Sequence, residues 1–417
     1  MSGTSRTALA VTVAIMAAVV VAAAPADLDA LLDGVEHVKV GGVPGPIAPI
    51  GPDAFAVLTG TSDGVRMPVV AASRYGQGRV VATGHFSFLD ANSLERADTS
   101  QLIVNCIRWA AHSEDPAVGV FRRDGFAEDL RDLGINAVQI DLSDLSGLDC
   151  IVLAPERAPK ESMAALEQFV RKGGGLVTAF LGWGWLQLNP DKTLSADSLS
   201  NGLLAPMGIV WLDGYLRQPD EGYPTADRPP ALLNASLALD AAIAHEAGDR
   251  ELSEDELALA GALLSRTVGA LPESEETLLP RINEVIRERG DIVPTEDEPM
   301  KAGQVLDRLA LTVRVREMMA AATEDVEAHP AAAQWPGVVP DDAPRVEREL
   351  IIDCNTWGWK SIGLYAAPGE VVEVTLPEAA TEAGLGLRIG SCTDRLWHKA
   401  EWKRVPEISR PSTWQRP

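Results

Sequence analysis

Residues 53–215 alternate short apolar runs with amphipathic helical stretches, and this alternation constrains the fold more than any other feature of the sequence. The runs predicted to be strands are 54–58, 67–73, 79–83, 118–121, 138–140, 150–153 and 176–180. The stretches with helical spacing are 99–111, 127–133 and 160–172. Strand–helix–strand repetition with short connections predicts an α/β domain with a doubly wound, flavodoxin-like parallel sheet.

Two glycine-rich stretches mark turns in this pattern. Tyr75-Gly-Gln-Gly78 predicts a tight turn before a returning strand. Gly173-Gly-Gly175 follows the helix predicted at 160–172 and is typical of a helix end. A phosphate-binding loop opens a helix, because the positive end of the helix dipole must face the anion. Gly173-Gly-Gly175 is therefore predicted to be a cap.

The sequence changes character twice after the α/β pattern. Pro219–Pro230 is polar and proline-rich, and the following 231–327 block is rich in Ala, Leu and Glu. Pro330–Pro344 is predicted to be a linker, and the later runs 350–352, 371–376 and 385–389 are β-like. We therefore expect four parts, which are a signal peptide (1–26), an α/β domain (27–225), a helical region (226–335) and a β-rich subdomain (340–417).

The amino-terminal segment is typical of an export signal. Arg6 precedes an apolar run from Ala8 to Ala24, and Ala24-Pro-Ala26 provides small residues before a cut at Asp27. An uncleaved membrane anchor is the alternative, because the run is only just long enough to span a bilayer. We therefore expect a secreted or cell-surface protein that contacts a membrane only if the segment is retained.

The charge balance argues against two classes of partner. The chain has 60 acidic and 36 basic residues, a formal net charge of −24. Such a surface repels nucleic acid phosphates and anionic lipids, and no Lys/Arg-rich run opposes it. We therefore expect no nucleic acid partner.

Four cysteines occur in the chain, an even number that permits disulfides in an exported protein. Cys354 and Cys392 share a compact C-terminal segment and are the predicted pair. Cys150 lies inside an apolar run and is predicted to be a buried, inert thiol.

The sequence offers little for a catalytic site. His245-Glu246 lacks the second histidine of H-E-x-x-H, and the six histidines are not clustered, so we predict no metal site. A nucleophile elbow like that of class I glutamine amidotransferases would follow strand 176–180. That turn instead contains Leu181-Gly-Trp-Gly-Trp185, without a Cys or Ser. An amidase of that type is disfavoured.

Three residues are candidates for ligand binding. His85 follows a predicted strand, where α/β folds often place ligand contacts, and a core or capping role is the alternative. Trp183 and Trp185 flank glycines in a predicted loop, where they could stack on sugar rings or on a partner. Packing against the end of the sheet is the other interpretation.

Several stretches resemble one known arrangement in the same order. Residues 74–85, 105–109, 169–176 and 183–185 resemble the amidotransferase-like N-terminal region of the TRP-melastatin channel-associated factors. Residues 358–371, 386–396 and 403–408 resemble the start of the enhancin-like zinc metallopeptidase module of the same proteins. The helical block at 231–327 has no counterpart in this resemblance.

The resemblance implies a secreted or surface metallopeptidase-like architecture, in a family whose members include mucin- and glycoprotein-cleaving enzymes. The family's H-E-x-x-H motif is expected beyond residue 417, so zinc is expected only in a longer relative. We therefore predict a non-catalytic part of such a protein that contacts a glycoprotein or a protein partner. The alternative is a zinc metallopeptidase, if the catalytic region is supplied downstream.

Overall fold

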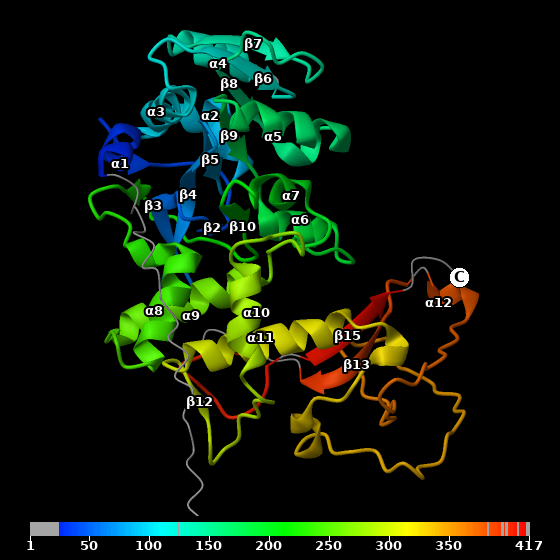
Figure 1. Ribbon diagram of the computed structural model, residues 1–417. Helices are drawn as coiled ribbons and strands as arrows, with labels where there is room; N and C mark the ends of the chain where they lie inside the picture. The colour runs from blue at the N-terminus through cyan, green and yellow to red at the C-terminus, as the bar shows by residue number, and fades with distance from the viewer. Residues whose placement is uncertain are drawn as a thin grey trace, which may run out of the picture.

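A seven-stranded sheet forms the centre of the N-terminal half (Figure 1). The computed structural model describes residues 25–123, 125–381, 383–392, 396, 399–406 and 408–413. The strand order across the sheet is β3-β4-β5-β9-β8-β6-β7. The strands are β3 (Ala54–Ser62), β4 (Val65–Tyr75), β5 (Gly78–Thr83), β6 (Ala117–Phe121), β7 (Asn136–Ile140), β8 (Cys150–Leu153) and β9 (Gly175–Ala179).

The sheet is mixed, and its strand directions follow from the lengths of the connections. β3, β4 and β5 pair antiparallel, because two-residue turns join them. β5, β9, β8, β6 and β7 are parallel neighbours, and helices connect several of them. The predicted α/β architecture is confirmed, with an antiparallel hairpin edge on a parallel sheet. The order β7-β6-β8-β9 matches the first four strands of a flavodoxin-like sheet, whose order is 2-1-3-4. The next strand in the sheet is β5, which precedes these four in the chain, whereas a flavodoxin-like sheet has its fifth strand there. The assignment to the flavodoxin-like fold therefore stays a prediction.

Helices cover the sheet on both sides (Figure 1). α3 (Thr99–Ala111) packs on β5, β8 and β9 through Leu102, Ile103, Cys106 and Ile107, which repeat at helical spacing. α5 (Met163–Arg171) contacts β5 and β9, and Figure 1 shows it across the sheet from α3. α4 (Phe126–Asp132) covers β6 and β7 at the far edge.

Two glycines of the β4–β5 turn are required by the backbone. Gly76 has a φ of +60°, which favours glycine. A Cβ on Gly78 would lie 2.1 Å from the carbonyl oxygen of Val170 at the end of α5. The predicted turn is therefore confirmed, and its glycines let the hairpin press against α5.

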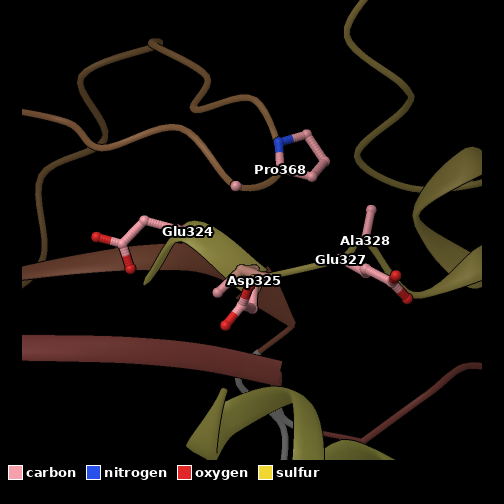
Figure 2. Close-up of a pocket in the computed structure, with 7 residues that line it drawn as sticks. Glu324, Asp325, Glu327, Ala328 and Pro368 are labelled. Carbon is pink, nitrogen blue, oxygen red and sulfur yellow. The ribbon is translucent and has the colours of Figure 1, made fainter. Parts of the chain in front are cut away.

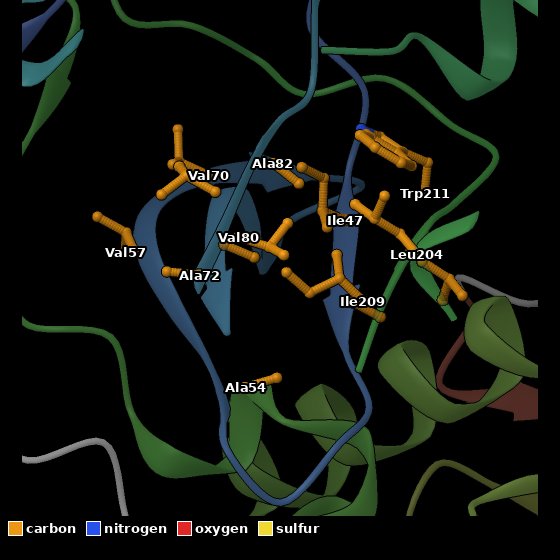
Figure 3. Packing of buried hydrophobic residues seen from close by; sticks show 14 of the residues in the cluster. Ile47, Ala54, Val57, Val70, Ala72, Val80, Ala82, Leu204, Ile209 and Trp211 are labelled. Atoms are coloured by element: carbon orange, nitrogen blue, oxygen red, sulfur yellow. The ribbon is translucent and has the colours of Figure 1, made fainter. Parts of the chain in front are cut away.

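A small second sheet packs on the large one (Figure 3). β2 (Ile47–Pro49) pairs antiparallel with β10 (Ile209–Trp211). In Figure 3, Ile47 and Ile209 face Val80 and Ala82 of β5. Trp211 is fully buried and donates its indole N–H to the carbonyl of Thr83 at 2.9 Å. β1 (His37–Val38) and β11 (Tyr223–Pro224) form another short antiparallel pair.

The helical region continues the same hydrophobic core. Its helices are α8 (Ala235–Glu246), α9 (Glu254–Val268), α10 (Leu279–Arg287) and α11 (Val305–Ala320). A capping box of Ser253 and Glu256 begins α9. One cluster of buried residues extends from Leu28 to Val313 and includes both the sheet and these helices. Asn234 adds a polar link, because its side-chain N–H₂ donates to the carbonyls of Gly51 (2.7 Å) and Ala54 (2.9 Å).

The C-terminal part is packed less closely. β13 (Gly386–Cys392) pairs with β15 (Ile408–Thr413), so the predicted strand at 385–389 is confirmed, and β12 (Met300–Lys301) pairs with β14 (Glu401–Trp402). The strands predicted at 350–352 and 371–376 are wrong, because residues 344–377 have no strand (Figure 1). A strand needs a partner for its backbone groups, and these residues have none among those described.

The described chain begins with a firmly held helix, α1 (Pro25–Leu31). Asp27 is buried and receives hydrogen bonds from Arg74 (2.7 Å) and from the indole of Trp109 (3.0 Å). Residues 1–24, the bulk of the predicted signal peptide, lie outside the described residues. Within the part of the chain that the structure describes, no helix combines the length and hydropathy needed to cross a bilayer.

Candidate functional site at the carboxyl edge of the sheet

The parallel strands β5, β9, β8 and β6 all end at one edge of the sheet, which we call the carboxyl edge. The chain order reverses between β8 and β6, because β7 lies outside β6 and β8 lies inside it. Open α/β sheets bind ligands outside the carboxyl ends of their strands at such a reversal. The side chains that follow these four strands are therefore the first candidates for a binding site.

His85 follows β5 and caps the short 3₁₀ helix η1 (Phe86–Leu89). Its Nδ1 accepts a hydrogen bond from the backbone N–H of Ser87 at 3.0 Å. Gly42 lies directly on the imidazole ring, where an added Cβ would be 2.7 Å from it. Burial lowers the pKa of His85, which favours the neutral ring. These contacts give His85 a capping role, and its role as a ligand contact stays a prediction.

Trp183 and Trp185 follow β9 and lie on the helix α6 (Gly182–Leu188), where the sequence predicted a loop. A Cβ on Gly182 would lie 2.4 Å from the carbonyl oxygen of Leu212, so close packing explains this glycine. Trp183 donates its indole N–H to the carbonyl of Val43 at 3.1 Å. Both indoles are half-buried. Partial burial is consistent with both predicted roles, which are packing against the end of the sheet and stacking on a ligand.

Trp185 belongs to a larger aromatic group. Phe180 is buried, and its ring centroid lies 6.3 Å from those of Phe86 and Trp185 and 5.5 Å from that of Trp211, each edge to face. Phe86 and Trp185 are half-buried. The group therefore has a buried centre and a partly exposed rim at the carboxyl edge. Such geometry is favoured by the ring quadrupoles and holds the rim rings in place.

Two arginines that sequence reasoning missed complete this edge. Arg122 directly follows β6, and Arg157 ends the short helix η2 (Pro155–Arg157) after β8. The Arg122 guanidinium donates to the carbonyl of Arg157 at 2.9 Å, and Arg157 donates in return at 3.4 Å. Both are exposed. The sequence does show that each arginine follows a strand. It does not show the order of the strands in the sheet, which brings the two arginines together.

The His245-Glu246 pair serves structure. His245 Nδ1 accepts from the backbone N–H of Leu252 at 3.2 Å, and Glu246 forms an ion pair with Arg289. Arg289 also binds Asp307 at 3.1 Å, so it joins α8 to α11. In the described part of the chain, no group of three or more His, Cys, Asp or Glu side chains could hold a metal ion.

An open recess of about 520 Å³ lies in the C-terminal part (Figure 2). Glu324, Asp325 and Glu327 line it on one side, and Pro368 lies on the other. Glu327 also accepts from Arg314 at 3.4 Å. Exposed carboxylates of this kind are well hydrated, so we assign no binding role to the recess.

The cysteines take no part in the carboxyl edge. Cys106 and Cys150 are fully buried free thiols, and burial raises the pKa of Cys106 to about 12 and that of Cys150 still further. The predicted burial of Cys150 is confirmed, and a raised pKa leaves little of the thiolate, which is the reactive form. Cys354 is exposed, while the side chain of Cys392 lies outside the described residues. Their pairing stays a prediction.

Two family models match this chain. A model described as "TRPM8, N-terminal domain" (TCAF_N) matches residues 4–226. A model of the N-terminal domain of M60-like peptidases matches residues 341–416. The two matches leave the helices between them unassigned.

Curated relatives match over much of the chain. TRPM8 channel-associated factor 2 of Bos taurus is 27% identical over 396 residues, which cover 92% of this chain and 41% of the relative. TRPM8 channel-associated factor 1 of Homo sapiens is 28% identical, with 82% of this chain and 37% of the relative covered. This chain thus spans about two fifths of the length of the relatives it matches. Among solved structures, the IMPa metallopeptidase from Pseudomonas aeruginosa is 14% identical, with a TM-score of 0.41, over 69% of this chain and 36% of that one.

Proposed function

Because the chain belongs to the TCAF N-terminal domain family, we propose that it is a binding module whose ligand contacts the carboxyl edge of the α/β sheet. It works as a non-catalytic, accessory part of an enhancin-like metallopeptidase-family protein, secreted or at the cell surface, and contacts a glycoprotein or a protein partner. The match of residues 341–416 to M60-like peptidases supports the peptidase-related role. The name of the relatives, channel-associated factors, supports a protein partner.

The observation that carries this proposal is the half-buried aromatic rim of Phe86 and Trp185, together with half-buried Trp183 on the same helix α6 as Trp185. It lies where open α/β sheets bind ligands. Packed aromatic side chains provide large contact area at a low cost in conformational entropy, and one exposed face can stack on a sugar ring. The turn after β9 has tryptophans where an amidotransferase-like fold would need a nucleophile.

A glycoprotein array tests the proposal. The purified chain should bind O-glycosylated proteins, and the double variant Trp183→Ala/Trp185→Ala should lose that binding. Trp335→Ala is the matched control, because Trp335 is exposed outside the carboxyl edge and should be neutral. Circular dichroism shows whether each variant is folded. Binding that survives in a folded double variant would place the ligand elsewhere and contradict the proposal.

A second candidate is favoured by the M60-like match alone. In a longer polypeptide with a catalytic region, residues 341–416 would precede a zinc site, and the whole would be a metallopeptidase acting on glycoproteins. Metal analysis and glycoprotein cleavage by such a polypeptide test this. Chelator-sensitive cleavage by the present 417 residues would contradict the non-catalytic assignment.

A further inference from the structure

The carboxyl edge combines a fixed aromatic surface with two arginines that have no acidic partner among the described residues. Arg122 and Arg157 follow the adjacent parallel strands β6 and β8, where the strand order reverses. Each guanidinium binds the backbone carbonyl of the other residue, so the two charges are held together. The backbone of Arg122 has a φ of +47°, a left-handed conformation that residues other than glycine rarely adopt.

Neither arginine forms an ion pair within the described ranges of the chain. Glu156, which precedes Arg157 in the chain, and Asp90, which follows η1, are both engaged in local structure. Glu156 accepts from the hydroxyl of Ser198 and the backbone N–H of Ser200, both at 2.9 Å. Asp90 caps α2 (Ala91–Leu94). The protein has a net charge of −24, so most of its surface repels anions. Two neighbouring arginines without an ion pair in the described part of the chain form a local positive patch that attracts an anion.

The aromatic rim lies beside these charges. The Arg157 guanidinium lies 5.7 Å from the centroid of the Phe86 ring. Phe86 packs through buried Phe180 to Trp185, and the ammonium of Lys192 lies 5.8 Å from the Trp185 ring. Two half-buried rings are thus placed between cations. Aromatic faces pack against the C–H face of a sugar, and guanidinium groups bind carboxylates or sulfates in a bidentate way.

We propose that the carboxyl edge binds an anionic sugar, with its carboxylate or sulfate on Arg122 and Arg157 and its ring against Phe86 and Trp185. This rests on the proposed binding function and names the chemistry of its ligand. A nucleic acid is disfavoured, because the rest of the surface repels an extended run of phosphates. A purely acidic peptide would use the arginines and leave the aromatic rings unused.

Calorimetric titration of the full chain tests the proposal with three defined sugars: 3′-sialyllactose, 3′-sulfolactose and lactose. We expect both acidic sugars, or one of them, to bind at least about tenfold more tightly than lactose, as charge-assisted bidentate pairs do. The acidic sugar that binds identifies the anionic group. Arg122→Gln/Arg157→Gln should remove this preference while lactose binding stays unchanged. Arg287→Gln/Arg348→Gln, which changes the net charge equally at exposed positions elsewhere, should keep the preference.

Other outcomes would overturn the inference. The three sugars could bind with equal affinity, unchanged in Arg122→Gln/Arg157→Gln and lost in Trp185→Ala. This result would show that the ligand needs no anionic group, and it would leave the proposed function intact. Inorganic sulfate or a glutamate-rich peptide that binds as tightly as the acidic sugars would remove the sugar requirement. Failure of every sugar to bind would also overturn it, and glycoprotein binding on the array would then show that the broader function survives. If the double arginine variant does not fold, Arg157→Gln alone gives the same comparison.

Discussion

The carboxyl edge of the sheet and the segment 344–377 both contain tryptophans, but they hold them differently. Trp183 and Trp185 are half-buried, and each has a neighbour that fixes its ring. Trp357 in the C-terminal segment is fully exposed, and Trp359 is 60% exposed beside Arg388. A fixed aromatic surface binds a ligand at a lower cost in entropy than a surface that must be ordered on binding. This difference supports our proposal that a ligand binds at the carboxyl edge.

The difference arises from neighbours and not from composition. Residues 346–374 include many large apolar side chains that are exposed, among them Ile351 at 99%. Buried apolar area stabilises a fold by roughly 25 cal/mol per Å², and exposed side chains contribute none of this. The sheet and helices from Leu28 to Val313 share one buried cluster, whereas the C-terminal part has a small second cluster around Trp402.

The largest expected effect comes from a tryptophan in each region. Trp211→Ala should lower the free energy of unfolding by about 3–5 kcal/mol, because it leaves a cavity in the main core. Trp357→Ala should change it by less than about 0.5 kcal/mol, because this side chain is exposed. Urea unfolding followed by circular dichroism measures both. A comparable cost for Trp357→Ala would show that segment 344–377 is packed in solution.

The next largest contrast is between an ion pair with a buried carboxylate, Asp27 with Arg74, and a pair that is exposed on both sides. Asp27→Ala should destabilise the fold by roughly 2–3 kcal/mol, because Trp109 loses its acceptor and Arg74 its partner. Glu370→Ala removes the exposed pair with Arg345 and should have little effect on unfolding. Equal effects of the two changes would contradict the contrast in packing.

Acid titration sharpens the Asp27 prediction. Burial opposes ionisation of Asp27, but hydrogen bonds from Arg74 and Trp109 outweigh it and hold the pKa below the ordinary 3.8. The unfolded chain therefore takes up a proton first. The stability contributed by Asp27 is present above about pH 4 and is lost as the pH falls through the lower, folded pKa. In Asp27→Ala this part of the acid-induced loss should be absent.

A smaller effect should separate the C-terminal part from the rest. Arg308 of α11 is buried, lies 4.2 Å from the centroid of the Trp402 ring and donates to the carbonyls of Lys399 and Ala400. Arg308→Ala should weaken this link by about 1.5–3 kcal/mol, the range for hydrogen bonds to a charged group. Faster hydrogen exchange at 399–406, with exchange in β5 and β9 unchanged, is the expected result. Faster exchange throughout the sheet would show that the two regions unfold together.

The smallest expected effect is the pH response of His85. Burial lowers its folded pKa, so the unfolded chain binds a proton first as the pH falls through 6.5, and stability decreases below that pH. His85→Asn keeps a capping side chain and should reduce this decrease between pH 7 and 5. Thermal unfolding at several pH values measures it. An unchanged pH dependence would mean that His85 is hydrated in solution.

Periodicity was sufficient for most elements of the ordered region. The spacing of Leu102, Ile103, Cys106 and Ile107 predicted α3, and apolar runs predicted the central parallel strands, because burial on one face or both leaves a clear pattern. α6 was missed because its glycines disfavour a helix. Gly182 is nevertheless required there, because the close approach of Leu212 leaves no room for a Cβ. The strands at 350–352 and 371–376 were over-predicted, because β propensity cannot report whether a partner strand is present.

The candidate site was predicted only in part. The sequence singled out His85, Trp183 and Trp185 because each follows a recognisable strand, and all three lie at the carboxyl edge, while their role in binding stays a prediction. Arg122 and Arg157 were missed because they are 35 positions apart in the sequence and are brought together by the strand order. That order is a long-range property which local patterns do not determine.

Hydrogen exchange of the full chain with and without a sialylated O-glycopeptide tests the central claim most directly. The account predicts slower exchange with ligand at the four segments of the carboxyl edge, 84–88, 121–123, 154–158 and 181–186, and a smaller decrease at the same ligand concentration in the Arg122→Gln/Arg157→Gln variant. Ligand-dependent protection confined to 344–377, with the carboxyl edge unchanged, would contradict it.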